Sequence, residues 1–268
     1  MVNDMPRISV KGCKLYYEIE GEGDWLVFAH GGDANHLCWY KQVAALKGRY
    51  RCLTYDARGY GLSDTSEQVV DAVHNAGDDL LALMDHLDIG RAILVGHSMG
   101  GMAVSGVSHS RPERVRRLVM SDTPFGFQTA ALSRWAVQMM DKISNGFNVM
   151  ENLFAPGFAE REPEMHGLYQ AICRMRVNEL PARPADDRAF EPYRRMRDAA
   201  PGDYLAFPIP SLFIVGDQDQ LTSPWMMEET AAMVGGARFI TIPGAGHSPF
   251  FEQTQLYNAA LETFLNDI

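Results

Sequence analysis

Short apolar runs that alternate with helix-like segments are the feature that most constrains the fold of this chain. The runs are continuous, as in strands that are buried on both faces of a parallel sheet. They are Trp25–Ala29, Arg51–Tyr55, Ala92–Val95, Val115–Met120, Ser211–Val215 and Arg238–Ile242. Segments with helical spacing lie between or after them, at Trp39–Leu46, Val69–Leu87 and Thr254–Leu265. Repeated strand–helix–strand units predict an α/β fold with a doubly wound, mostly parallel sheet and right-handed crossovers. An edge strand is predicted at Lys14–Ile19, after the turn at Lys11–Gly12.

The alternation stops between Phe125 and Phe207, where the sequence has no clear strand. This stretch is rich in methionine and aromatic residues and also carries several arginines. The pattern predicts a helical insertion that lies over the C-terminal edge of the sheet. We therefore divide the chain into a core domain, residues 1–124 and 208–268, and a helical cap, residues 125–207.

The segment Gly96–Gly101, with sequence Gly-His-Ser-Met-Gly-Gly, joins an apolar strand to a helix-like run. A Gly-x-Ser-x-Gly sequence between a strand and a helix is typical of a nucleophile elbow. The sharp turn strains the serine backbone and leaves no room for side chains two residues away, which Gly96 and Gly100 satisfy. Ser98 is therefore the predicted nucleophile, and backbone N–H groups of the helix N-terminus can stabilise a developing oxyanion.

A serine hydroxyl needs a base to remove its proton, and the base needs an orienting acid. In the doubly wound hydrolase layout these follow in the order Ser, Asp or Glu, His, each after a strand. His247 lies in a glycine-flanked loop directly after the last strand and is the predicted base. His109 is eleven positions beyond Ser98 on the same helix, about 16 Å along its axis and out of reach. His166, in the cap, is the weakest alternative.

The acid is expected after the strand that precedes the one leading to His247. The loop Gly216–Gln220 offers two aspartates, and we choose Asp219, which stands deeper in the loop. Asp217 remains an alternative. Asp122, which follows the strand after the nucleophile, is a second alternative.

The oxyanion hole needs two N–H donors. We choose Met99, directly after the nucleophile, and Gly32 in the loop after Ala29, with Asp33 as the alternative to Gly32. The predicted substrate pocket consists of Asp33, His36, Trp39, Phe125 and Trp135. Each of the first three could equally cap or pack the next helix, and the cap aromatics could form the cap's own core.

Composition and charge exclude several classes of partner. The formal net charge is −10, which argues against nucleic acid or an anionic membrane surface. We find no signal-peptide pattern at the N-terminus and no apolar run of membrane-spanning length. The four cysteines have no paired spacing, which is typical of reduced thiols in a cytoplasmic protein. We interpret Asp56–Gly61 as structural, because an Asp/Arg pair beside a glycine turn usually fixes a loop.

Over essentially its whole length, the chain resembles the α/β-hydrolase superfamily. The matching motifs are His30-Gly31, Asp56–Gly61, Gly96–Gly101, Gly216–Asp219 and Gly246–Pro249. The resemblance implies the α/β-hydrolase fold with the helical cap inserted after the sixth strand of that fold. Ser98 departs from the haloalkane dehalogenases and epoxide hydrolases, which carry an aspartate nucleophile. Ser248 departs from carbon–carbon bond hydrolases of aromatic ring cleavage, which often have tryptophan there.

Together the residues predict a serine hydrolase of a small, largely apolar carboxylic ester or lactone, similar to small-molecule carboxylesterases and enol-lactonases. The expected partner is a small-molecule substrate, and neither a metal nor an organic cofactor is expected. Three alternatives stay open: a carbon–carbon bond hydrolase, a cofactor-free dioxygenase of a heteroaromatic substrate, and a ligand receptor on the same scaffold. The oligomeric state also stays open, a homodimer included.

Overall fold

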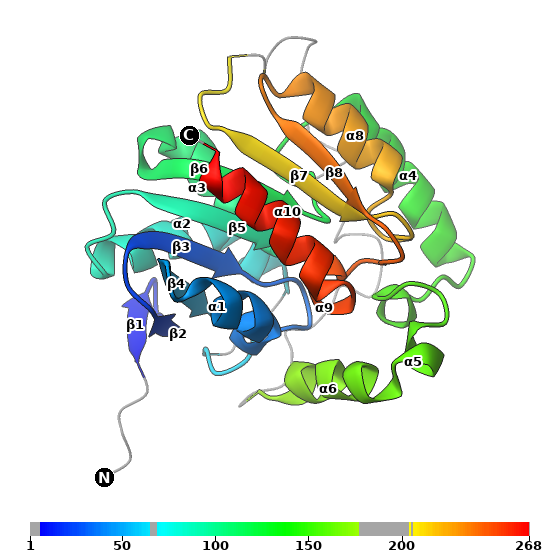
Figure 1. Cartoon of the computed structure of the whole chain (residues 1–268), viewed down its shortest axis with the longest axis horizontal. Coiled ribbons are helices and arrows are strands. Elements are labelled where there is room, and N and C mark those ends of the chain that lie inside the picture. Colours follow the sequence, from blue (N-terminus) through cyan, green and yellow to red (C-terminus); the bar gives the residue numbers. More distant parts are fainter. Residues whose placement is uncertain (1–5, 65–68, 177–203, 205, 268) are drawn as a thin grey trace.

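The computed structural model describes residues 6–64, 69–176, 204 and 206–267, and an eight-stranded sheet forms its centre (Figure 1). The strand order is β1-β2-β4-β3-β5-β6-β7-β8. The strands are β1 (Arg7–Val10), β2 (Cys13–Glu20), β3 (Asp24–Ala29), β4 (Tyr50–Tyr55), β5 (Ala92–His97), β6 (Val115–Ser121), β7 (Ser211–Gly216) and β8 (Arg238–Ile242). The pairs β1–β2 and β2–β4 are antiparallel, and the other neighbouring strands are parallel. The predicted α/β fold with a mostly parallel sheet is confirmed.

The edge of the sheet differs from the prediction. The strand predicted at Lys14–Ile19 is β2, which lies between β1 and β4 and is not the edge. The edge is β1, a four-residue strand that pairs with β2 across the turn at Lys11 and Gly12. The sequence Arg-Ile-Ser-Val does alternate polar and apolar residues, and Ile8 and Val10 are buried, but four residues are the shortest run in which such an alternation indicates a strand.

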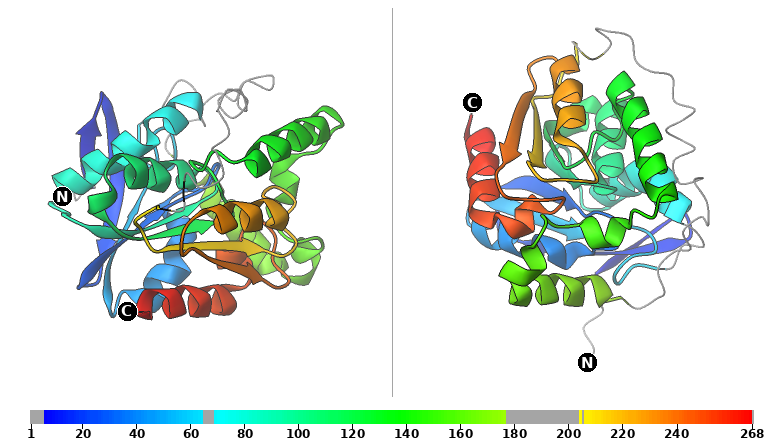
Figure 2. Two further views of the ribbon diagram at one scale, coloured as in Figure 1. Left: turned by 90° about the horizontal axis from the view of Figure 1, so that it is seen from above. Right: turned by 90° about the vertical axis from the view of Figure 1, so that its right-hand side faces the viewer.

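Helices cover both faces of the sheet (Figure 2). One face packs against α2, α3 and α8, and the other against α1, α9 and α10. The bounds are α1 (Tyr40–Leu46), α2 (Val69–His86), α3 (Gly100–Ser110), α8 (Pro224–Met233), α9 (Pro249–Glu252) and α10 (Thr254–Asn266), with the 3₁₀ helices η1 (His36–Trp39) and η2 (Pro112–Arg114). Each central strand serves both faces, because successive side chains point to opposite sides. Along β3, Val27 and Ala29 face α2 and α3, whereas Leu26 and Phe28 face η1 and α1.

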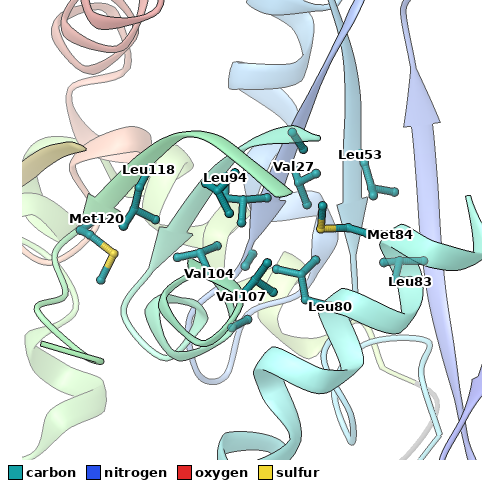
Figure 3. Packing of buried hydrophobic residues seen from close by; sticks show 14 of the residues in the cluster. Val27, Leu53, Leu80, Leu83, Met84, Leu94, Val104, Val107, Leu118 and Met120 are labelled. Carbon is teal, nitrogen blue, oxygen red and sulfur yellow. The ribbon is translucent and has the colours of Figure 1, made fainter. Parts of the chain in front are cut away.

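The core beneath α2 and α3 holds the centre of the sheet rigid (Figure 3). Val104 and Val107 of α3 and Leu80 of α2 pack on the apolar side chains of β3, β5 and β6, such as Leu94 and Leu118. All five side chains are fully buried. Burying a side chain of this size stabilises the fold by about 1.5–3 kcal/mol. The start of α3, where the predicted nucleophile lies, is thus fixed by core packing.

The strand order also says where a site can form. The chain moves from β3 to β4 on one side of β3, and β5 then pairs on its other side. The loops after β3 and β5 therefore leave the sheet in opposite directions, which opens a crevice at the C-terminal ends of these strands. The loop after β3 begins at His30, and the loop after β5 contains Ser98.

Between β6 and β7 the described residues form helical segments only, namely α4 (Ala130–Ser144), η3 (Val149–Asn152), α5 (Phe158–Arg161) and α6 (Pro163–Arg174). We call residues 125–176 the insertion. The predicted cap 125–207 extends over residues 177–203 and 205, which lie outside the described residues, so its boundaries stay a prediction. In the described parts of the chain, no helix combines the length and apolarity that crossing a membrane requires.

Gly100 gives a test of how tightly α3 starts against the sheet. A Cβ atom at Gly100 would lie 2.3 Å from the carbonyl oxygen of Ala29 and 2.7 Å from that of His30. Both are backbone atoms that cannot move without shifting β3, so Gly100→Ala is expected to lower the free energy of unfolding by about 2 kcal/mol or more. Urea unfolding measures this. Gly90→Ala is the control, because a Cβ there meets no atom within 4 Å and should change stability little. Equal stabilities of the two variants would contradict the packing described here.

Candidate active site

Ser98 occupies a strained turn between β5 and α3. Its φ is +49°, in the left-handed region that non-glycine residues adopt at a cost of about 1–2 kcal/mol. The turn is held because the Ser98 N–H donates to the carbonyl of Ser121 at the end of β6 (3.1 Å). Met99 is the N-cap of α3, so the helix N-terminus lies directly beside the serine. This is the backbone geometry that Gly-x-Ser-x-Gly predicted, and backbone strain of this kind concentrates at functional sites.

The loop after β3 lies against this turn. A Cβ at Gly31 would approach Nδ1 of His97 to 2.6 Å and Cβ of Ser98 to 3.2 Å, so the two loops are in contact. A Cβ at Gly32 would meet nothing within 4 Å. Gly32 therefore borders open space next to the serine, as its predicted role in the oxyanion hole requires. Whether the N–H groups of Gly32 and Met99 bind an oxyanion stays a prediction.

His247 and Asp219 are in direct contact. Nδ1 of His247 lies 2.8 Å from Oδ2 of Asp219, and both side chains are almost fully buried. The other oxygen, Oδ1, accepts the backbone N–H groups of Leu221 (2.7 Å) and Thr222 (2.9 Å). Two backbone donors thus orient the Asp219 side chain, and its contact with Nδ1 favours the His247 tautomer that carries the proton on that nitrogen. Nε2 of His247 is then left to accept a proton. The alternative acid Asp217 instead accepts the N–H of Gly244 (2.8 Å) at an exposed position.

Asp122, the other alternative acid, lies beside this pair. Ligand atoms of Asp122, Asp219 and His247 all lie within 4.8 Å of one another. Burial raises the pKa of Asp122 well above its usual range, and the charge of Asp219 raises it further. The Gly216 N–H donates to Oδ1 of Asp122 (3.0 Å), and the hydroxyl of Ser121 donates to Oδ2 (2.9 Å). Asp122 therefore belongs to the same hydrogen-bonded cluster, and burial favours its neutral form.

This trio is also the one place, among the described residues, where His, Cys, Asp and Glu side chains are close enough together to hold a metal ion. Its oxygens already accept backbone N–H groups, a hydroxyl and the His247 ring. A cation there would have to displace these donors. The arrangement fits a hydrogen-bonded acid–base chain better than a metal centre.

His97 is a residue whose role the sequence did not reveal. Its Nε2 donates to the carbonyl oxygen of His247 (2.6 Å), and the two rings lie 4.9 Å apart. Burial lowers the pKa of His97 well below its usual value, and the nearby His247 lowers it further, so the ring is neutral. His97 therefore ties the loop that carries His247 to the turn that carries Ser98. The two histidines are 150 positions apart, and no local pattern could show this contact.

Three of the predicted pocket residues follow the loop after β3. Asp33 is buried with φ +62°. His36 is buried with Nδ1 2.8 Å from Asp56 and Nε2 3.3 Å from Glu18. Trp39 is fully buried, and its ring packs against Phe28 and Phe250. His36 therefore belongs to a polar network with Asp56 and Glu18, and Trp39 belongs to the core.

The other two predicted pocket residues belong to the insertion. Phe125 is half-buried, and its ring lies 5.7 Å from that of Trp135. Trp135 is buried, and its Nε1 donates to the carbonyl of Leu221 (2.6 Å), two residues after Asp219. Half-buried Met102 of α3 packs against the same apolar cluster. We call residues 217–223, between β7 and α8, the acid loop. Apolar side chains of the insertion thus lie between the acid loop and the start of α3.

The motif Asp56–Gly61 fixes loops, as its interpretation as structural predicts, but its charged residues have separate partners. Arg58 makes a two-pronged contact with Asp79 of α2, at 2.7 and 3.0 Å. Asp56 accepts the backbone N–H of His36 (2.6 Å) and of Leu62 (2.7 Å). Through these bonds Asp56 joins the loop after β4 to the loop after β3.

The comparisons with known proteins agree with this architecture. The chain is 26% identical to "3-oxoadipate enol-lactonase 2" of Acinetobacter baylyi, over 96% of this chain and 95% of the relative. The structure is similar to a hydrolase from Pseudomonas aeruginosa (TM-score 0.76, 24% identity, all of both chains). It is also similar to an enol-lactonase from Burkholderia xenovorans (TM-score 0.73, 24% identity, 98% of this chain and all of the other). At these identities the structural likeness shows the fold. The "Alpha/beta hydrolase family" model matches residues 26–260, and the chain belongs to this family.

Proposed function

We propose that this α/β hydrolase cleaves small, largely apolar carboxylic esters or lactones through an acyl-enzyme on Ser98. The observation that carries the proposal is the buried His247–Asp219 pair, tied by His97 to the strained turn at Ser98. The names of the relatives support the substrate class, because a 3-oxoadipate enol-lactonase covers nearly the whole chain. A structural neighbour is described as a degrading enzyme for N-acyl homoserine lactones.

In the proposed reaction, the Ser98 oxygen attacks the substrate carbonyl while Nε2 of His247 takes the hydroxyl proton. Asp219 keeps Nδ1 protonated and stabilises the imidazolium that forms. The N–H groups of Met99 and Gly32 bind the oxyanion of the tetrahedral intermediate. His247 then protonates the leaving alkoxide, which in a lactone stays attached to the acyl group. Water, activated by the same nitrogen, releases the acid and restores Ser98.

The apolar side chains near the site favour an apolar acyl or alcohol group. Met102, Phe125 and Leu153 are half-buried members of the cluster that lies between the insertion and α3. A substrate placed beside Ser98 and Gly32 would cover part of their surface. Each CH₂ group so buried favours binding by about 0.8 kcal/mol.

Pre-steady-state kinetics with p-nitrophenyl acetate and butyrate test the proposal. We expect a burst of p-nitrophenol stoichiometric with enzyme, and an acyl adduct on the peptide that contains Ser98 when the reaction is quenched. Butyrate should react with a higher kcat/KM than acetate. Faster cleavage of a vinylogous diketone than of either ester would instead identify a carbon–carbon bond hydrolase. Oxygen uptake with hydroxylated heteroaromatics, without any burst, would identify a dioxygenase.

A further inference from the structure

The insertion contacts each of the three loops that carry the proposed catalytic groups. Trp135 binds the acid loop at Leu221. Asn35, which follows Gly32 in the loop after β3, donates from Nδ2 to the carbonyls of Ile172 (2.6 Å) and Met175 (3.1 Å). The third contact runs through a carboxylate, Glu252, that neither the sequence motifs nor the proposed reaction uses.

We call residues 243–248, between β8 and α9, the base loop, because they include His247. Glu252 is the last residue of α9, five positions after His247, and its side chain turns back toward the base loop. Its Oε1 accepts the N–H of Gly246 (2.8 Å) and, more weakly, that of Ser248 (3.3 Å), on either side of His247. Its Oε2 accepts the N–H of Ala155 in the insertion (2.8 Å). One carboxylate thus holds both flanks of His247 and the backbone of the insertion at Ala155.

The backbone of the base loop packs closely against the insertion and against the end of β7. A Cβ at Gly246 would lie 2.3 Å from the Ala155 nitrogen and 2.3 Å from the Phe154 carbonyl carbon. On the opposite side, a Cβ at Gly216 would lie 2.0 Å from the Gly246 oxygen. The base loop is therefore enclosed between the end of β7 and the insertion.

We propose that Glu252 is a positioning residue that joins the insertion to the base loop and holds His247 on Asp219. The inference rests on the proposed function, since it gives Glu252 a role in a reaction at Ser98. Three N–H groups point at two oxygens, so a carboxylate is the acceptor that satisfies all of them. A displacement of His247 by a fraction of an ångström changes its reach to Ser98, and misplacement of about 1 Å can cost about 100-fold in rate.

The surroundings of Glu252 give the proposal a pH signature. Burial raises the pKa of Glu252 to about 7, while the three N–H donors lower it and the charge of Asp219 raises it. The buried Tyr169 of α6 also faces it, and Lys41 of α1 lies nearby over the Phe251 ring. Below this pKa one oxygen becomes an O–H donor that opposes an N–H donor. The set of three hydrogen bonds to Glu252 is thus complete above about pH 7 and weakens as the pH falls.

The test compares Glu252→Gln with Asp217→Asn. Gln keeps the size of the side chain but presents its NH₂ group to one of the three N–H groups. Asp217 is the matched control, because it also accepts a backbone N–H of the base loop, that of Gly244, but at an exposed position away from the insertion. We expect Glu252→Gln to lower kcat for p-nitrophenyl butyrate by about 10- to 100-fold with little change in KM. Asp217→Asn should leave both unchanged.

Two readouts separate positioning from a purely structural role. The acid limb of log kcat against pH should be steeper in the wild type than in Glu252→Gln, because protonation of Glu252, with a pKa of about 7, adds to the loss of activity only in the wild type. Amide hydrogen exchange at Ala155 and Gly246 should be faster by about tenfold or more in Glu252→Gln and unchanged in Asp217→Asn. Wild-type kcat and slope in Glu252→Gln, or equal effects of the two variants, would overturn the proposal.

The proposal about Glu252 can still be tested if Glu252→Gln does not fold or if the proposed function is wrong. If Glu252→Gln does not fold, Glu252→Asp keeps the charge but is one methylene too short to reach Gly246 and Ala155 together, and the same losses are expected. If the wild type shows neither ester turnover nor an acyl adduct on the Ser98 peptide, the proposed function is wrong. The exchange experiment then still decides whether Glu252 joins the insertion to the base loop. Unchanged exchange at both amides would show that Glu252 does not join the insertion to the base loop.

Discussion

Replacing Ser98 by alanine is expected to lower kcat for p-nitrophenyl butyrate by about 10⁶-fold and to abolish the burst. The magnitude follows from the loss of the nucleophile, which disables the base and acid as well, because the three act as one unit. Substrate binding and oxyanion stabilisation remain, and they should leave a rate about 10³- to 10⁴-fold above that of the reaction in water. Stopped-flow absorbance of p-nitrophenol measures the loss.

Two further variants make this result specific. Ser110→Ala removes an exposed hydroxyl from the same helix, one that donates to the Gly106 carbonyl (2.7 Å), and should keep wild-type kcat. Ser98→Gly should be as inactive as Ser98→Ala and at least as stable, because glycine adopts φ +49° without the steric cost that a Cβ brings. A Ser98→Ala enzyme that keeps its burst would exclude Ser98 as the nucleophile.

The strained turn at Ser98 could be predicted because its physics is local. Strand, glycine, serine, glycine and helix are consecutive, and steric exclusion near Ser98 demands small residues at fixed offsets. The central strands were predictable for a similar reason, since burial on both faces leaves a continuous apolar run. The same reasoning failed at β1, where the four residues from Arg7 pair with β2 only because a turn brings them back.

The connections that hold the site together could not be predicted. His97, Asp122 and Glu252 act through backbone groups that are distant in sequence or belong to the insertion. Such contacts depend on the path of the chain in three dimensions and leave no periodicity. Pocket residues could not be predicted for the same reason. The sequence around a tryptophan does not show whether its ring faces a ligand or packs in the core, as that of Trp39 does against Phe28 and Phe250.

The choice between acids illustrates what the structure adds. The sequence placed Asp219, Asp217 and Asp122 after neighbouring strands and favoured Asp219 by its depth in the loop. Direct contact with Nδ1 of His247 distinguishes Asp219 from the exposed Asp217. Asp122 is also buried and lies close by, but its carboxyl accepts the Gly216 N–H and the Ser121 hydroxyl, and burial favours its neutral form.

Replacing Asp219 by asparagine is expected to lower kcat by about 10⁴-fold, because the amide stabilises the wrong tautomer of His247 and leaves no charge to balance the imidazolium. Asp122→Asn is the matched variant. Asparagine has nearly the shape of a protonated carboxyl, tolerates the φ of +49° at this position, and keeps both an acceptor for the Gly216 N–H and a donor toward Asp219. It should change kcat less than about tenfold. A loss as large as that of Asp219→Asn would mean that the two carboxylates share the catalytic charge.

Stability against pH tests the same assignment without any substrate. The pKa of Asp122 is raised by burial above its value in the unfolded chain, so the folded protein keeps a proton that the unfolded protein loses. The contribution of Asp122 is therefore fully present at acid pH and declines as the pH rises through the unfolded and then toward the folded pKa. Asp122→Asn removes this decline. In urea unfolding, its stability relative to the wild type should increase between pH 5 and pH 8. A constant difference between the two proteins would show that Asp122 is ionised in the folded state and that the charge beside His247 is not carried by Asp219 alone.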